Sequence, residues 1–177
     1  CFNEKRKLGE NDSYICHLIR NDLVEEFIIY VNKTNLSLSK TKIIPSIFET
    51  NSFLNKNEPT LIEYAAFYGS IQIFQYLQMN NVELSKSLWL YAIHGNNAEI
   101  IHILEYNQVK PEDITYMQCY KESIKCHHNN IANYLENVYL KNDHESNYFE
   151  NLYAYCYHYH NYEFFAEDLN KMFIPFY

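Results

Sequence analysis

Two short clusters of cysteine and histidine are the groups in this sequence that could bind a metal or activate a thiol. Cys126 is followed by His127 and His128, and Cys156 is followed by His158 and His160. A zinc site usually needs four nitrogen or sulfur ligands in one closed set, and a catalytic thiol needs a base held against it and a third orienting group. No C-x-x-C or H-E-x-x-H pattern is present. We therefore predict no metal ligands here, and histidines that are solvated in loops.

The sequence also lacks the glycine-rich motifs of nucleotide-dependent enzymes. Its 3 glycines are Gly9, Gly69 and Gly95, which are too few and too far apart for a P-loop or a G-x-G-x-x-G turn. A G-x-S-x-G nucleophile motif is absent as well. We therefore predict no catalytic residues, no bound cofactor and no enzymatic activity.

Composition limits the partners that this chain could bind. Its 177 residues are 47% hydrophobic, which is enough for a core, and the formal net charge is −8. Arg6 and Arg20 are the only arginines, so a basic surface for nucleic acid is not expected. No run approaches the roughly 18 apolar residues of a membrane span. The 5 cysteines form no paired spacing, which indicates reduced thiols. We therefore predict a cytoplasmic chain that binds neither nucleic acid nor a membrane.

A unit of two short apolar helices recurs along the chain. In the clearest copy, the first helix ends at Gly69 and the second begins a few residues later; the next copy has Gly95 at the same place. A third copy places Cys126 there, and weaker copies begin at Cys16 and Cys156. The segments concerned are 61–69 with 71–77, 88–95 with 99–105, 120–126 with 129–136, 16–21 with 23–28, and 156–160 with 163–165.

The physical reason for such a repeat is that a helix of about ten residues cannot bury its apolar stripe alone. Ala65, Ala66 and Ala92 are small enough to let paired helices approach closely. Gly69 and Gly95 fall where the first helix ends, in a backbone state expected to favour glycine. No segment shows sustained alternation of apolar and polar residues, so few or no strands are expected.

The segment Thr60–Gly69, with sequence TLIEYAAFYG, resembles the ankyrin unit T-P-L-H-x-A-A-x-x-G. The family's Thr, Leu, alanine pair and Gly fall on Thr60, Ile62, Ala65–Ala66 and Gly69. Leu61 and Glu63 stand where the family has Pro and His. The overall sequence pattern of the chain is similar to that of the degenerate ankyrin repeats expanded in parasitic protists. The resemblance implies an all-α or nearly all-α fold, an ankyrin-like solenoid of about 4 to 5 stacked helix-turn-helix repeats.

The resemblance sets the expected domain organisation. Residues 1–12 form a polar lead, residues 13–165 form the repeat array, and residues 166–177 are an aromatic tail or the start of a further repeat. Residues 43–48 are expected as a short helix or an inserted segment packed on the array. Trp89 is expected to pack in the core or between repeats.

Ankyrin proteins usually bind partners on a concave face that includes the exposed residues just before the conserved Gly. The resemblance therefore implies a non-catalytic protein–protein interaction module with a concave binding surface. The alternative is a structural scaffold that self-associates through its aromatic C-terminal end. The candidate partner-binding residues are Phe67, Tyr68, Ile93, His94, Ile124, Lys125, His158 and Tyr159.

Overall fold

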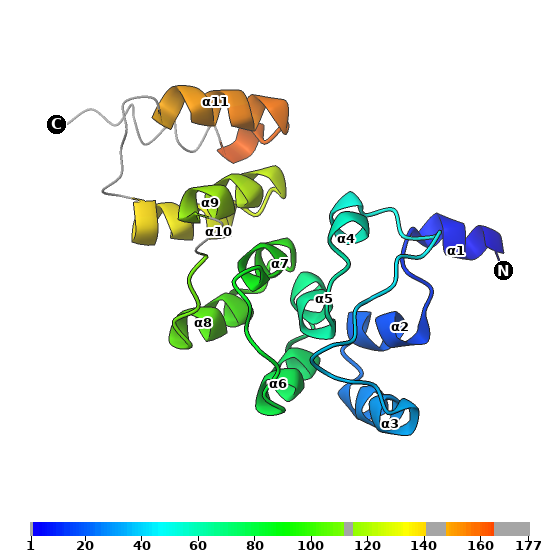
Figure 1. The fold of residues 1–177 in the computed structure, drawn as a ribbon. Helices are drawn as coiled ribbons and strands as arrows, with labels where there is room; N and C mark the ends of the chain where they lie inside the picture. The colour runs from blue at the N-terminus through cyan, green and yellow to red at the C-terminus, as the bar shows by residue number, and fades with distance from the viewer. Residues whose placement is uncertain (1, 112–114, 141–147, 165–177) are drawn as a thin grey trace. The chain divides into compact units, whose positions relative to one another are not determined.

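The computed structural model describes residues 2–111, 115–140 and 148–164 (Figure 1). Within these ranges the regular secondary structure is helical, and an isolated antiparallel bridge joins Lys42 to Thr60. The prediction of an all-α fold is confirmed. None of the described helices combines the length and the apolar character needed to cross a membrane. The chain divides into two compact units, Cys1–Val109 and Lys110–Tyr177.

The first unit contains three consecutive helix pairs and two additional short helices. In Figure 1 the first helices of the three pairs lie in one row, with the second helices in another row beside them. Packing joins α2 to α5 and α5 to α7 in the first row, and α3 to α6 in the second. The pairs are α2 (Tyr14–Arg20) with α3 (Val24–Thr34), α5 (Leu61–Tyr68) with α6 (Ile71–Met79), and α7 (Leu88–His94) with α8 (Ala98–Tyr106); the additional helices are α1 (Phe2–Leu8) and α4 (Ser52–Asn57).

A residue with left-handed backbone marks the turn between the two helices of each pair, and we call it the turn residue. After Asp22, Gly69, His127 and His160, a backbone N–H reaches back five residues to a carbonyl of the first helix, as from Ser70 to Ala65 at 2.9 Å and from Leu23 to Leu18 at 3.0 Å. This is the bond that ends a helix in a Schellman-type turn. Among the residues that the structure describes, the turn residues are Asp22, Gly69, Asn96, His127 and His160.

The two glycines at the ends of α5 and α7 have different roles. Gly69 has φ 67°, which confirms the predicted left-handed conformation. Gly95 has φ −70°, so the same prediction was wrong for it, and Asn96 is the turn residue of that pair. Glycine is required at position 95 because of a close contact, since a Cβ there would lie 2.2 Å from the carbonyl oxygen of Ala66. The register of the second copy is therefore shifted by one residue from the glycine alignment.

Hydrogen bonds between successive pairs fix how they pack. The Ser70 hydroxyl donates to the Ile19 carbonyl at 2.5 Å. The Asn97 amide donates to the Gly69 carbonyl at 3.3 Å. The carboxylate of Asp22 accepts the backbone N–H groups at the start of α6, at 2.9 and 3.0 Å. Each pair is thus tied to a carbonyl or an N–H group at the turn of its neighbour.

The second helices also end in a common way. Asn35, Asn81 and Gln108 have left-handed backbone after α3, α6 and α8. The next N–H bonds back to the carbonyl of a buried residue at 2.9–3.1 Å. The bonded pairs are Leu36 with Val31, Val82 with Leu77, and Val109 with Leu104. A recurring apolar–x–x–x–Asn/Gln–apolar sequence therefore marks the end of each second helix in the first unit.

The N-terminal lead is tied to the segment that comes after α3. Helix α1 has no buried residues, but Asn11 is only 2% exposed. Its backbone N–H donates to Glu49 Oε2 at 3.2 Å and its side-chain amide donates to the Ile44 carbonyl at 2.8 Å. Residues 43–48 form no helix. Of the two predicted forms, a short helix or an inserted segment, the first is therefore wrong. The helix of this region is α4, which Asn51 caps.

Trp89 is fully buried, as predicted. Its indole Nε1 donates to the Val109 carbonyl oxygen at 2.7 Å. Val109 in turn bonds through its N–H to Leu104 on α8. The ring therefore fills the core of this pair and satisfies a carbonyl at the end of α8, which is the kind of partner that a buried indole N–H requires.

The second unit repeats the pattern with α9 (Tyr116–Lys125), α10 (Asn129–Leu135), a π-helical continuation η1 (Glu136–Leu140) and α11 (Tyr148–His158). Helix α9 begins with a capping box in which Thr115 and Gln118 satisfy each other's backbone N–H groups. It packs against both α10 and α11. The Asn161 amide donates to the Ile124 carbonyl at 2.8 Å, as Ser70 does to Ile19. The predicted tail, residues 166–177, lies outside the described residues.

Candidate functional site

Counting back from the turn residue gives the helix pairs a common numbering. The candidate binding residues can then be compared at equivalent positions. Two residues before each turn residue is a side chain that is partly or fully exposed, and we call this the rim position. Three residues before it is the stacking position, where the next pair packs. The rim positions hold Arg20, Phe67, His94, Lys125 and His158; the stacking positions hold Ile19, Ala66, Ile93, Ile124 and Tyr157.

Two of the candidate residues are corrected by this numbering. Ile93 and Ile124 are both 0% exposed, so they belong to the core and not to a binding surface. The physical reason is the one-residue shift in register, because aligning Gly95 with Gly69 pairs Ile93 with Phe67. The turn residue instead pairs Ile93 with Ala66, which is also fully buried.

The other candidates of the first unit lie together on α5 and α7. The ring centroids of Phe67 and Tyr68 are 5.0 Å apart, and those of Phe67 and His94 are 5.2 Å apart. The guanidinium carbon of Arg20 lies 5.9 Å from the centroid of the Tyr68 ring. The four side chains therefore make a continuous strip across three helix pairs.

Helix α4 packs on this strip through Phe53. Its ring centroid lies 4.3 Å from that of His94, 6.1 Å from that of Phe67 and 4.9 Å from that of Tyr91. Phe53 is not among the candidates of the sequence analysis, because it lies in a segment of mostly polar residues. The signal that could have found it is Asn51, a favoured N-cap that lies two residues before Phe53, the first of an aromatic and apolar pair.

Arg20 is held in place by several acceptors. One Nη donates to the Tyr64 hydroxyl at 3.0 Å and to the Asn11 carbonyl at 2.8 Å, and Nε lies 3.0 Å from Glu10 Oε2. Burial raises the pKa of Tyr64 far above its usual value, and it also raises the pKa of Tyr68. Both phenols are therefore neutral at physiological pH, so Arg20 supplies the cation at this end of the strip.

The second unit has its own strip on α9 and α11. Lys125 Nζ lies 2.7 Å from Glu122 Oε1 and 5.9 Å from the centroid of the Tyr159 ring. The Tyr159 ring packs edge-on against His158 at 4.7 Å and also contacts Tyr155 at 4.7 Å. Lys125, His158 and Tyr159, three of the candidate residues, are thus brought together. Tyr155 joins them, although the sequence analysis did not select it.

The cysteines do not have the properties of activated nucleophiles. Burial, together with the nearby charge of Glu122, raises the pKa of the Cys126 thiol to about 11. His127 donates from Nε2 to the Tyr159 carbonyl at 2.9 Å. Cys156 is 1% exposed, whereas His158 is on the surface. A protonated thiol is a poor nucleophile, so these observations count against thiol chemistry at Cys126.

No family model, curated protein or solved structure matches this chain. The resemblance to ankyrin repeats therefore stays a prediction, and the residues and their contacts carry the functional argument.

Proposed function

We propose that this chain is an ankyrin-like solenoid that recognises a protein partner through its rim residues, without catalysis. The observation that carries the proposal is the common numbering: each pair presents one side chain at the rim position, and in all the described pairs but the last the preceding residue is fully buried. In the first unit these side chains form a contiguous aromatic strip that ends in Arg20.

The chemistry of the strip suits protein recognition. Aromatic residues and arginine are enriched at the centres of protein interfaces. Arg20, Phe67 and His94 are held by helices that pack on one another, so little side-chain freedom remains to be lost on binding. The second-unit strip, with Lys125 and Tyr159, has the same combination of a cation beside an aromatic ring.

Replacing Phe67 and Tyr68 together by Ala should weaken binding of a partner by at least about 30-fold, the effect of losing about 2 kcal/mol at a hot spot. The partner is first identified by affinity capture and mass spectrometry, and its affinity is then measured by calorimetry with purified proteins. Tyr106→Ala is the matched control, because Tyr106 is 89% exposed on α8 and is not a rim residue.

Two results would refute the assignment of the rim. One is a Phe67→Ala/Tyr68→Ala variant that keeps its helical circular dichroism spectrum and binds with unchanged affinity. The other is an equal loss of affinity in Tyr106→Ala. Lys125→Ala and His158→Ala repeat the test on the second unit, where each substitution is at a partly or fully exposed position.

A further inference from the structure

The last described helix pair leaves its stacking position uncovered. Ile19, Ala66, Ile93 and Ile124 at this position are each 0% exposed, whereas Tyr157 is 73% exposed. The last pair has the same backbone turn as the pairs of Ile19, Ala66 and Ile124, with the Asn161 N–H bonded back to the Cys156 carbonyl at 2.9 Å, so the turn itself does not account for the difference in exposure.

Within each unit, the following pair is what covers the stacking position. The Ser70 hydroxyl reaches the Ile19 carbonyl, Gly95 lies directly against the Ala66 carbonyl, and the Asn161 amide reaches the Ile124 carbonyl. This side of a first helix is therefore the side on which another helix packs.

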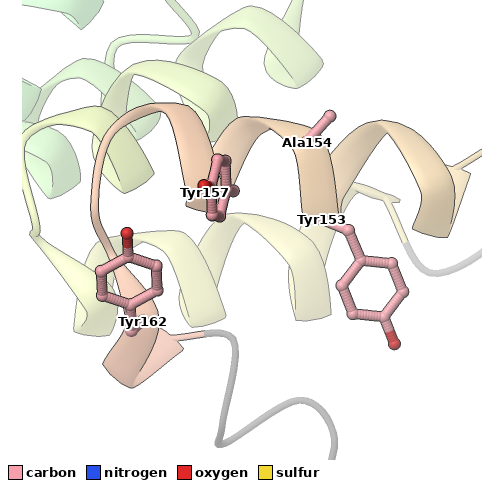
Figure 2. A pocket seen from close by; sticks show the side chains of 4 residues that line it. All are labelled: Tyr153, Ala154, Tyr157 and Tyr162. Carbon is pink, nitrogen blue, oxygen red and sulfur yellow. The ribbon is translucent and has the colours of Figure 1, made fainter.

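On α11 this side carries an apolar hollow of about 400 Å³. Figure 2 shows Tyr157 between Tyr153 and Tyr162, with Ala154 on the same helix. The rings of Tyr157 and Tyr162 are 6.3 Å apart in an edge-on arrangement. None of the four lining residues is acidic or basic, so bringing two such surfaces together places no like charges of the lining against each other.

We propose that this surface, which we call the α11 face, is the interface of a two-fold dimer, and that its occupant is the same face of a second copy of this chain. A two-fold interface requires a surface that is complementary to itself, and tyrosine rings pack well against one another edge-on. Tyr157 and Tyr162 are 73% and 51% exposed and Tyr153 is half-buried, so the three rings can bury about 300 Å² per copy, which is less than a standard specific interface buries. The dimer should therefore be weak.

A head-to-tail arrangement fits the structure less well. The residue after the turn residue supplies the hydrogen bond to the preceding pair in Ser70, Asn97 and Asn161. In the first pair this residue is Leu23, whose side chain has no donor. The leading side of α2 and α3 therefore lacks the group that ties a pair to its predecessor, and the α11 face is left to pair with itself.

Sedimentation velocity of the full chain across a range from low to high micromolar concentration tests the proposal. The wild type should shift from monomer to dimer as concentration rises. Tyr157→Asp, which places a carboxylate near the two-fold axis on both copies, should weaken the dimer at least about 10-fold. Tyr106→Asp is the control, because it adds the same charge at another exposed tyrosine, 89% exposed, in the other unit.

A wild type that stays monomeric at every concentration would overturn the proposal, and so would a Tyr157→Asp variant that dimerises as the wild type does. Tyr157→Ser removes the ring without adding charge and should also weaken the dimer. The Phe67→Ala/Tyr68→Ala variant should dimerise as the wild type does. Failure of the dimer proposal would therefore leave partner recognition at the rim untouched, and failure of partner recognition would leave the dimer proposal untouched.

Discussion

Trp89→Ala should lower the free energy of unfolding by about 3–5 kcal/mol, the usual cost of removing a large buried aromatic side chain. The ring is 0% exposed and lies between α7 and the end of α8. Its loss leaves a cavity in the pair and removes the donor that satisfies the Val109 carbonyl. Urea unfolding followed by circular dichroism measures the change without relying on tryptophan fluorescence.

Trp89→Phe separates the two contributions. It keeps most of the ring volume but removes Nε1, so the expected loss is about 1–3 kcal/mol for the carbonyl left without its donor. A Trp89→Ala variant as stable as the wild type would show that the ring is not part of the packed core. Equal losses for the two variants would show that the hydrogen bond, not the packing, dominates.

Gly95→Ala should destabilise the first unit by about 1–3 kcal/mol or more, because it adds a methyl group where there is no space. The added Cβ would lie 2.2 Å from the Ala66 carbonyl oxygen, closer than such atoms approach in folded proteins. That atom is backbone, so no side-chain rotation can relieve the contact, and α5 and α7 must separate. The measurement is again the free energy of unfolding in urea.

Asn96→Gly is the matched substitution at the neighbouring residue. Asn96 is the turn residue of this pair, with φ 47°, and is exposed. Glycine adopts this backbone freely, so stability should stay within about 0.5 kcal/mol of the wild type. If Gly95→Ala were harmless and Asn96→Gly strongly destabilising, the close approach of α5 and α7 would not be a feature of the protein.

The helical fold was predictable because its signals are local. The segment from Thr60 to Gly69 contains its own N-cap, its apolar face and its terminating glycine, and the structure shows a capping box at Thr60 and a left-handed Gly69. The burial of Trp89 followed from its place in an apolar helix. Such features depend on neighbouring residues alone, which is why one sequence was enough to identify them.

The register of the copies was harder, because two different physical requirements select glycine. Gly69 is needed for a left-handed turn, whereas Gly95 is needed for a close backbone contact with another helix. From sequence alone the two look alike, and aligning them shifted Ile93 onto the surface. The left-handed Asn96 and His127 gave no comparable signal, since both residues are common in many settings.

The aromatic strip of the first unit was partly predictable. Phe67, Tyr68 and His94 were selected and the structure brings them together. Phe53 was not, because its contact with His94 depends on how an inserted segment folds back on the array. Nothing in the spacing of residues 43–57 specifies that path.

The central claim is that helix pairs of the first unit succeed one another by translation. Lys33, Met79 and Tyr106 occupy the same position near the ends of α3, α6 and α8, two residues before the left-handed Asn or Gln, and all three are exposed. Spin labels on cysteines at these sites, taken two at a time, can report their separations. Cys1→Ser and Cys126→Ser provide the background, since Cys16, Cys119 and Cys156 are buried.

Dipolar spectroscopy should give similar 33–79 and 79–106 distances, each on the order of one helix-to-helix step of 10 Å plus the label arms. The 33–106 distance should be the longest of the three and close to the sum of the 33–79 and 79–106 distances. A 33–106 distance no longer than either of the others would mean that the three pairs cluster around a common centre, and the translational account would be wrong.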